Sequence, residues 1–313
     1  MSEPRKIIID TDPGQDDAAA IMLALGSPEL QILGLTTVAG NVPLALTARN
    51  ARIILEFCSH TDVKVYAGAD RPIARPLITA EHVHGKTGLD GPELHEPKLP
   101  LEEQHAVDFI IETLKREPAG AVTLCTLGPL TNIAMALEKA PEIAGRIHEL
   151  VMMGGGFFEG GNITPAAEFN IYVDPEAAAA VFKAGIPIVM MPLDVTHKVL
   201  TLKSRVARLR EIGSRPARAL VEMLDFFERF DVEKYGSDGG PLHDPTVIAY
   251  LLKPELFAGR NCNVEVETTS PLTVGMTVVD WWQVTGREHN AMVMKDVDAD
   301  GFFALLTERV GRL

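Results

Sequence analysis

The chain has 313 residues, of which 46% are hydrophobic and 23% charged, as is typical of a globular protein with an apolar core. Its formal net charge of −14 argues against nucleic-acid binding, because phosphate backbones are bound by clustered lysine and arginine. The chain shows no signal-peptide pattern and no apolar stretch long enough for a bilayer, and its three cysteines have no metal or disulfide spacing, so we expect a cytoplasmic protein with no membrane partner.

Apolar β-rich runs alternate with helical patterns along the first two thirds of the chain. The predicted strands are residues 6–9, 31–38, 63–66, 122–125, 148–153 and 186–191. The predicted helices are residues 17–25, 44–57, 105–115, 130–139 and 175–183. Strands that are apolar on both faces and separated by helices predict an α/β fold with an open, mostly parallel central sheet flanked by helices.

The remaining segments have a different pattern. Residues 205–229 are predicted to be helical, residues 264–279 alternate as expected for a small late β-hairpin, and residues 300–310 predict a closing helix. Residues 71–100 are rich in glycine, proline and histidine with weak periodicity, which is typical of a functional loop. Without a repeat or a flexible linker, we expect residues 1–313 to form a single domain.

The most informative segment directly follows the first predicted strand. It reads Asp10-Thr11-Asp12-Pro13-Gly14-Gln15-Asp16-Asp17, with four carboxylates within eight residues. If two or three of them met, their mutual repulsion would favour binding of a hard cation. The alternative is helix capping, since aspartate is preferred at a helix N-terminus. Capping accounts for one or two of the four, so the segment favours a metal site.

Polar or small residues also follow the later predicted strands. Asn41, Thr126, the glycines after Met153, and Asp194 each come shortly after a strand. Any one of them is more simply a turn residue. Because parallel sheets bind ligands at the carboxyl ends of their strands, their recurrence indicates one functional edge of the sheet.

Two further segments carry candidate ligand-binding groups. The glycine-rich loop 161–170 contains Asn162, Glu168 and Asn170, which together could recognise a polyol or could belong to an ordinary loop. Asp174 precedes a proline as a helix N-cap does, so we assign it to structure. The segment His243-Asp244-Pro245 has the same Asp-Pro form, but its histidine and the preceding glycines favour a functional role.

Taken together, these segments resemble the inosine-uridine nucleoside hydrolases. The resemblance is carried by the aspartate-rich signature and, in chain order, by Val38-Ala39-Gly40-Asn41, His84-Gly85-Lys86-Thr87-Gly88-Leu89-Asp90-Gly91, Leu127-Gly128-Pro129-Leu130-Thr131-Asn132, Met152-Met153-Gly154-Gly155, Ala167-Glu168-Phe169-Asn170 and His243-Asp244-Pro245. It implies an open α/β fold around a mainly parallel sheet, one tightly bound Ca²⁺ per subunit, and dimers or tetramers. The implied calcium ligands are Asp12, Asp17, Asp244 and the main-chain carbonyl of Thr126.

The resemblance also implies an activity, the hydrolysis of the N-glycosidic bond of ribonucleosides to free base and ribose. Calcium-bound water would attack through an oxocarbenium-like transition state, with Asp12 as general base and His243 as acid or hydrogen-bond donor at the leaving base. The implied substrate-binding residues are Asp16, Asn41, His84, Met153, Asn162, Glu168 and Asn170.

The resemblance also implies that base preference depends on Phe227, Asp231 and Tyr235, which precede the His243 segment. Relatives that prefer uridine and cytidine carry glutamine at the Asp231 position and tyrosine at the Tyr235 position. This chain matches at Tyr235 and departs at Asp231, so it favours pyrimidine ribonucleosides over a purine or broad specificity.

Two other functions remain alternatives. A phosphatase using the aspartate cluster would need a phosphate cradle, yet the chain has no Walker-type loop and no lysine or arginine beside Gly154-Gly155-Gly156. A non-catalytic nucleoside-binding protein would be expected to lose Asp12 or another ligand, whereas every implied ligand position is filled.

Overall fold

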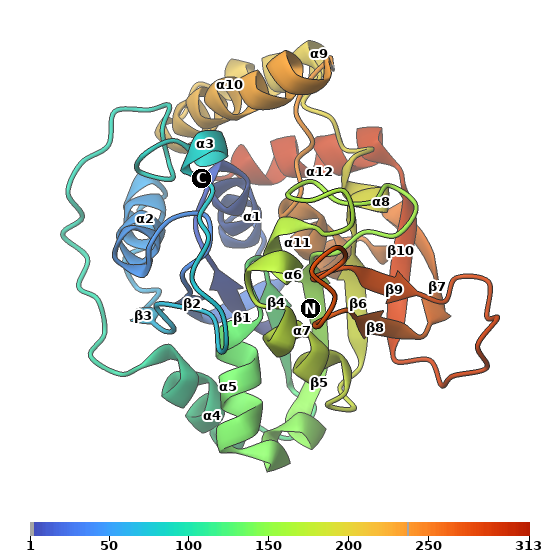
Figure 1. Ribbon diagram of the computed structural model, residues 1–313. Coiled ribbons are helices and arrows are strands. Elements are labelled where there is room, and N and C mark those ends of the chain that lie inside the picture. Colours follow the sequence, from blue (N-terminus) through green and yellow to red (C-terminus); the bar gives the residue numbers. More distant parts are fainter. Residues whose placement is uncertain (1–2, 237) are drawn as a thin grey trace.

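The computed structural model describes residues 3–236 and 238–313, with the backbone alone for residues 230–235. Within this part of the chain, an eight-stranded sheet has the order β3-β2-β1-β4-β5-β6-β10-β7, and a separate hairpin pairs β8 with β9. All neighbours in the large sheet are parallel except β7, which runs antiparallel to β10. Figure 1 shows the sheet between two layers of helices. The predicted fold class is confirmed.

The strands of the large sheet and the hairpin have the following bounds: β1 (Arg5–Thr11), β2 (Leu30–Thr37), β3 (Val65–Ala67), β4 (Val122–Thr126), β5 (Ile147–Met153), β6 (Ile188–Met191), β7 (Phe257–Cys262), β8 (Val264–Val266), β9 (Thr277–Val279) and β10 (Ala291–Val297). The helices are α1 (Gln15–Leu25), α2 (Leu44–Phe57), α3 (Glu81–His84), α4 (Ala106–Arg116), α5 (Thr131–Lys139), α6 (Phe169–Val173), α7 (Pro175–Phe182), α8 (Leu193–Thr196), α9 (Lys203–Ile212), α10 (Arg215–Tyr235), α11 (Pro245–Leu252) and α12 (Ala299–Val310), with short 3₁₀ turns η1 (Pro141–Arg146) and η2 (Pro254–Leu256).

Alternation along the strands divides the apolar core into two halves. In β1, Ile7 and Ile9 face one cluster of buried side chains, and Ile8 faces the other. The first cluster contains the buried faces of α1, α2, α10, α11 and α12, and the second contains those of α4, α5 and α7. Since successive strand residues point to opposite faces, a strand covered on both sides must be apolar throughout.

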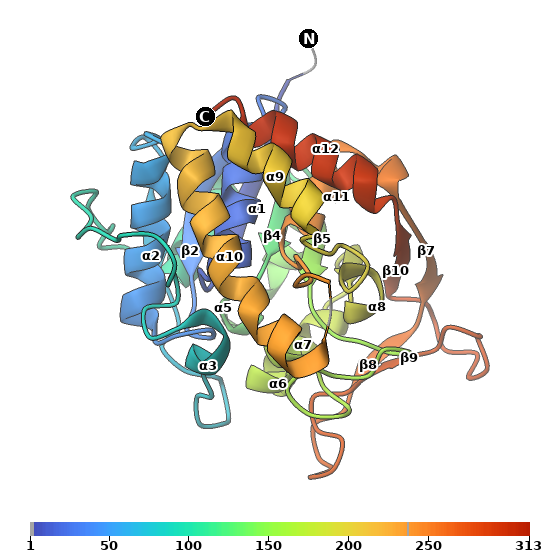
Figure 2. The same ribbon diagram turned by 90° about the horizontal axis from the view of Figure 1, so that it is seen from above.

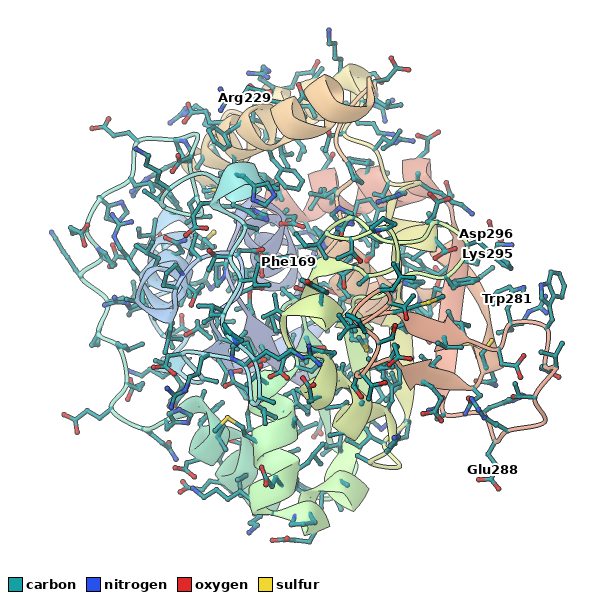
Figure 3. The ribbon with its side chains drawn as sticks, in the orientation of Figure 1. Phe169, Arg229, Trp281, Glu288, Lys295 and Asp296 are labelled. Carbon is teal, nitrogen blue, oxygen red and sulfur yellow. The ribbon has the colours of Figure 1, made fainter. Side chains whose placement is uncertain are left out.

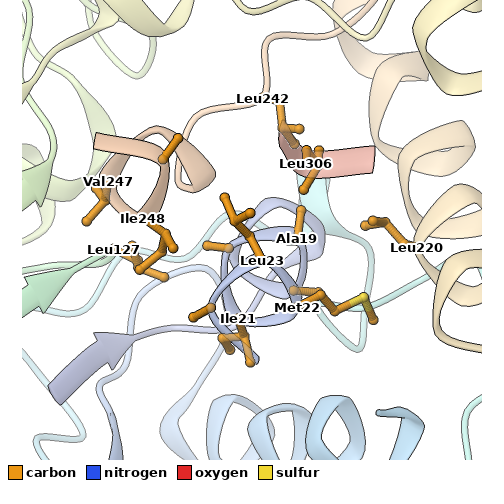
Figure 4. Packing of buried hydrophobic residues seen from close by; sticks show 14 of the residues in the cluster. Ala19, Ile21, Met22, Leu23, Leu127, Leu220, Leu242, Val247, Ile248 and Leu306 are labelled. Carbon is orange, nitrogen blue, oxygen red and sulfur yellow. The ribbon is translucent and has the colours of Figure 1, made fainter. Parts of the chain in front are cut away.

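Helix α1 lies inside the first half of the core and is enclosed on all sides. Its residues from Gln15 to Ala24 are all buried, and Figure 4 shows Ala19, Ile21, Met22 and Leu23 pointing toward different neighbours. A helix that is apolar all round is stable only in such an interior position. In Figure 2 the hairpin of α9 and α10 crosses over it. This packing fixes the N-terminus of α1 close to the carboxyl end of β1.

Some secondary-structure elements differ from those that the sequence pattern predicts. The late hairpin is present as β8 and β9, but residues 205–229 lie in two helices, because Gly213 adopts a left-handed φ of 69° and ends α9. Strands β7 and β10 and helix α11 had not been predicted. Among the described residues, no helix combines the length and apolarity needed to cross a membrane.

Candidate active site

The predicted polar residues converge at the carboxyl ends of the central strands. Asp12 follows β1 and Thr126 ends β4, and these two strands pair side by side with Asp10 opposite Thr126. The strand order turns at this point, since β2 and β3 lie on one side of β1 whereas β4, β5 and β6 lie on the other. Such a reversal leaves a crevice outside the strand ends, which is where α/β sheets bind ligands.

Three carboxylates come together above this point. Oxygen atoms of Asp16, Asp17 and Asp244 all lie within 4.8 Å of one another, and all three side chains are buried. Burial raises the pKa of Asp244 well above its usual range, and the charges of Asp16 and Asp17 raise it further. Buried like charges at this distance require a cation or protons, so the group could hold a metal ion.

Asp12 lies beside this group but outside the three-carboxylate set. Its Oδ2 accepts a hydrogen bond of 2.8 Å from the main-chain nitrogen of Asn41, whereas its Oδ1 is buried without a hydrogen-bond partner in the described chain. Burial raises the pKa of Asp12 well above its usual range, and the charge of Asp17 adds to this effect. A buried oxygen left unsatisfied in this way is suited to a cation or a bound water.

The helix-capping alternative holds for Asp17 but not for Asp244. Asp17 accepts from the main-chain nitrogen of Gly14 at 2.9 Å and from the hydroxyl of Thr11 at 2.5 Å, so it caps α1 while remaining in the carboxylate group. Asp244 is the N-cap residue of α11, yet its side chain makes no capping bond. Asp174, assigned to structure, does cap α7. The Asp244 carboxylate is thus directed to the Asp16 and Asp17 carboxylates and not to the end of the helix.

A cavity opens directly above the carboxylates. Its interior volume is about 110 Å³, and its mouth is open to solvent. Predicted site residues that line it are Asp16, Asn41, His84, Met153, Asn162, Glu168, Asn170, Phe227, His243 and Asp244. Asp12, Asp17 and Thr126 are buried beneath it. Figure 3 shows Phe169, another lining residue, near the middle of the molecule.

The side-chain amides in the cavity have defined orientations. Asn170 donates from Nδ2 to the main-chain oxygens of Leu127 and Met153, at 2.8 and 3.3 Å, which leaves its Oδ1 as the acceptor for a ligand. Asn162 uses Oδ1 to accept from the Phe169 nitrogen, which leaves its NH₂ group as a donor. This mixture of donors and acceptors is suited to vicinal hydroxyl groups.

Glu168 has both a structural role and a place in the cavity wall. Its carboxylate accepts from the main-chain nitrogens of Gly155 and Asn170, each at 2.9 Å, so it caps α6 and holds the glycines that follow β5. Burial raises its pKa to about 7. Glu168 is therefore a structural anchor that also presents a carboxyl group to a ligand.

Histidines and an aromatic ring line another part of the cavity. His84 stacks near Phe227, with ring centroids 5.5 Å apart, and His243 lies 2.7 Å from the hydroxyl of Thr196 through Nδ1. Burial lowers the pKa of both histidines, that of His84 to about 3. Both rings are consequently neutral near pH 7 and can donate or accept single hydrogen bonds.

Some participants had not been predicted. His197 lines the cavity 5.8 Å from the ring of His243, and Gln15 hydrogen-bonds to the ring of His84. The only available signal for Gln15 was its place inside the aspartate-rich signature. The side chains of Asp231 and Tyr235, named for base preference, lie outside the described residues.

The fold and this cavity define an α/β protein with a polar pocket beside three buried carboxylates that could hold a metal ion. The family model described as inosine-uridine preferring nucleoside hydrolase matches residues 7–304, and the chain belongs to this family. The resemblance in the sequence is thereby confirmed.

Individual relatives agree with this assignment. The chain is 50% identical to the pyrimidine-specific ribonucleoside hydrolase RihA of Photobacterium profundum, covering 99% of each chain. It is also 50% identical to RihA of Escherichia coli O7:K1, covering 97% of each. Among solved structures, a purine-preferring ribonucleoside hydrolase from Gardnerella vaginalis superposes with a TM-score of 0.91 at 33% identity, covering 98% of each chain.

Proposed function

We propose that this nucleoside hydrolase cleaves pyrimidine ribonucleosides, with uridine and cytidine as substrates, and that it depends on Ca²⁺. One observation carries the proposal: a single cavity is lined by the Asp16 and Asp244 carboxylates, with Asp17 buried beside them, and by oriented amides and two neutral histidines. The 50% identity to relatives named pyrimidine-specific supports the choice of base over the purine alternative.

The chain offers an all-oxygen ligand set, which calcium prefers. We assign Asp17, Asp244, Asp12 and the main-chain carbonyl of Thr126 to the ion. Asp12 is included because its Oδ1 is a buried oxygen without a partner in the described chain. Asp16 also lies in the carboxylate group, but it lines the cavity, and we assign it to the ligand as the family resemblance implies. When bound, the ion supplies ribose orientation and a lowered pKa of nearby water.

The side chains around the cavity have distinct proposed roles in catalysis and binding. Asp12 removes a proton from the attacking water, Asp16 accepts a hydrogen bond from the 2′-hydroxyl, and Asn41, Asn162, Glu168 and Asn170 hold the ribose with Met153 beneath it. Anionic oxygens beside the sugar stabilise its developing positive charge. His243 donates a hydrogen bond to the departing base, and His84 and Phe227 contact the base ring.

We further propose that the protein is one domain over residues 1–313, forms a homo-oligomer and resides in a reducing, cytoplasmic compartment. Phe158 and Trp282 are 53% and 69% exposed, and they flank Trp281, which Figure 3 shows together with Lys295 at the β10 side of the molecule. Exposed aromatic surface of this kind favours association. All three cysteines are buried and unpaired, in keeping with a reducing environment. Light scattering on the purified protein would test the oligomer.

The deciding experiment incubates the pure protein with uridine, cytidine and inosine, with and without a strong chelator, and separates base from nucleoside by chromatography. We expect release of uracil and cytosine, loss of activity on chelation and recovery with Ca²⁺. Inosine as the clearly best substrate would refute the pyrimidine preference. No release by folded, calcium-loaded protein would refute the hydrolase proposal.

A further inference from the structure

The side chain of Gln15 connects the aspartate-rich signature to the loop that carries His84. Gln15 is fully buried, and its Nε2 donates to the main-chain oxygens of His84 and Asp90 at 2.9 and 3.1 Å. Its Oε1 lies 2.8 Å from Nδ1 of His84. The opposite amide orientation would place Oε1 against two carbonyl oxygens, so the network leaves only this one.

This orientation determines which nitrogen of His84 carries the proton. An amide oxygen only accepts hydrogen bonds, so Nδ1 of His84 must be the donor. A neutral imidazole with a proton on Nδ1 has a free electron pair on Nε2. Burial lowers the pKa of His84 to about 3, which keeps the ring neutral near pH 7.

The ring itself is held in place on two sides. It stacks near Phe227 with an interplanar angle of 27°, and a Cβ on residue 14 would lie 2.5 Å from Nδ1, so only glycine there permits this approach. His84 lines the cavity, and its Nε2 makes no hydrogen bond to any other group in the described chain. Nε2 is therefore available to a ligand as a fixed acceptor.

We propose that Gln15 is a positioning residue that holds His84 in the Nδ1–H tautomer, so that Nε2 accepts a hydrogen bond from an N–H group on the pairing edge of the bound nucleobase. This inference rests on the proposed function and extends it. The part of the site that contacts the base therefore contains a hydrogen-bond acceptor. The N3–H group of uracil or the amino group of cytosine can donate to it. Methylation of N3 of uracil removes the donor and leaves the acceptor without a partner.

The first test determines the tautomer of His84 in the absence of substrate. It uses ¹H–¹⁵N correlation NMR of the histidine rings in the calcium-loaded protein. The His84→Gln variant identifies the His84 signals by their loss. We expect a protonated Nδ1 and a bare Nε2 in the wild-type protein. The reverse pattern, with the proton on Nε2, would overturn the proposal.

The second test separates the tautomer from loop anchoring. Gln15→Met removes the acceptor and both loop contacts, whereas Asn50→Leu, the matched control, removes two comparable contacts to the main-chain oxygens of Pro13 and Thr87 without touching the His84 ring. We expect Gln15→Met to lose the pure Nδ1–H pattern and Asn50→Leu to keep it. A pure Nδ1–H pattern in Gln15→Met would count against the positioning role.

The third test compares kcat/KM for uridine and 3-methyluridine. Leaving one buried acceptor unpaired lowers kcat/KM by roughly 10- to 100-fold. We therefore expect kcat/KM of the wild-type protein to be higher for uridine than for 3-methyluridine by at least about 10-fold. Gln15→Met should compress the ratio, and Asn50→Leu should preserve it. An equal ratio in all three proteins would overturn the inference while leaving the hydrolase function intact, whereas a wild-type protein inactive on every ribonucleoside would refute that function instead.

Discussion

Gly128 packs directly against the carboxylate of Asp12, so closely that a Cβ on residue 128 would lie 2.2 Å from Oδ1. On the other side, a Cβ on residue 40 would lie 2.1 Å from Oδ2. The Asn41 nitrogen also binds Oδ2. The two glycines thus allow the carboxylate of Asp12, the proposed general base, to lie between them, and a side chain at either position would collide with it.

The first prediction concerns this contact. Gly128→Ala should reduce kcat by about 10²-fold or more, because the new methyl group displaces Asp12 and base catalysis is worth about 10²–10⁴-fold. Gly145→Ala is the control, since a Cβ there meets nothing within 4 Å. Steady-state kinetics and circular dichroism on both variants check the result. A folded Gly128→Ala protein with wild-type kcat would contradict the proposed role of Asp12.

The second prediction concerns calcium affinity and pH. Burial and neighbouring charges raise the pKa values of Asp12 and Asp244, so the metal-free protein keeps protons there that the cation must displace. Calcium binding should therefore release protons, and its apparent affinity should fall as pH decreases. Isothermal titration calorimetry at pH 6 and 8, in two buffers of different ionisation enthalpy, measures both effects. Binding without proton release at either pH would exclude this explanation.

The third prediction concerns Asp10, which is buried beneath the site. Its Oδ1 accepts from Thr36 and Asn132, and burial raises its pKa to about 7 from the usual 3.8. The native state therefore binds one more proton than the unfolded state between these values. Its contribution to stability is fully present below pH 3.8 and is lost as pH rises through about 7.

Asp10→Asn removes this titration while keeping the acceptor oxygen. In the presence of chelator, urea midpoints of the wild-type protein should fall more steeply between pH 5 and 7.5 than those of the variant. Comparing the two proteins isolates Asp10, because every other titrating group is common to both. Parallel pH dependences would show that Asp10 does not keep its proton in the folded protein.

The fourth prediction concerns the sugar. If Asp16 and the calcium site meet the 2′-hydroxyl, a 2′-deoxynucleoside lacks both the hydrogen bond to Asp16 and the oxygen ligand for calcium. Sites built to bind a hydroxyl group discriminate against its absence by about 10⁴-fold. We expect kcat/KM for 2′-deoxyuridine to be lower than that for uridine by about this factor. Comparable turnover of both nucleosides would mean that the ribose is bound in another orientation.

Much of the fold could be predicted from local sequence. Ile7, Ile8 and Ile9 form a strand that is apolar on both faces, and this pattern requires a covered parallel sheet. Strands β7 and β10 could not be predicted in the same way. Exposed residues interrupt their apolar patterns, and their antiparallel pairing joins two segments separated by the β8–β9 hairpin.

The family, the α/β class and the residue types of the site follow from the linear sequence, because the aspartate-rich signature and each later motif are contiguous in the chain. Which of these groups meet depends on the three-dimensional fold. It brought Asp16 together with Asp17 and Asp244, left one oxygen of Asp12 without a partner in the described chain, and directed Gln15 to the ring of His84. Hydrogen-bond direction and carboxylate spacing depend on how distant strand ends and loops pack together, and a linear pattern does not contain that information.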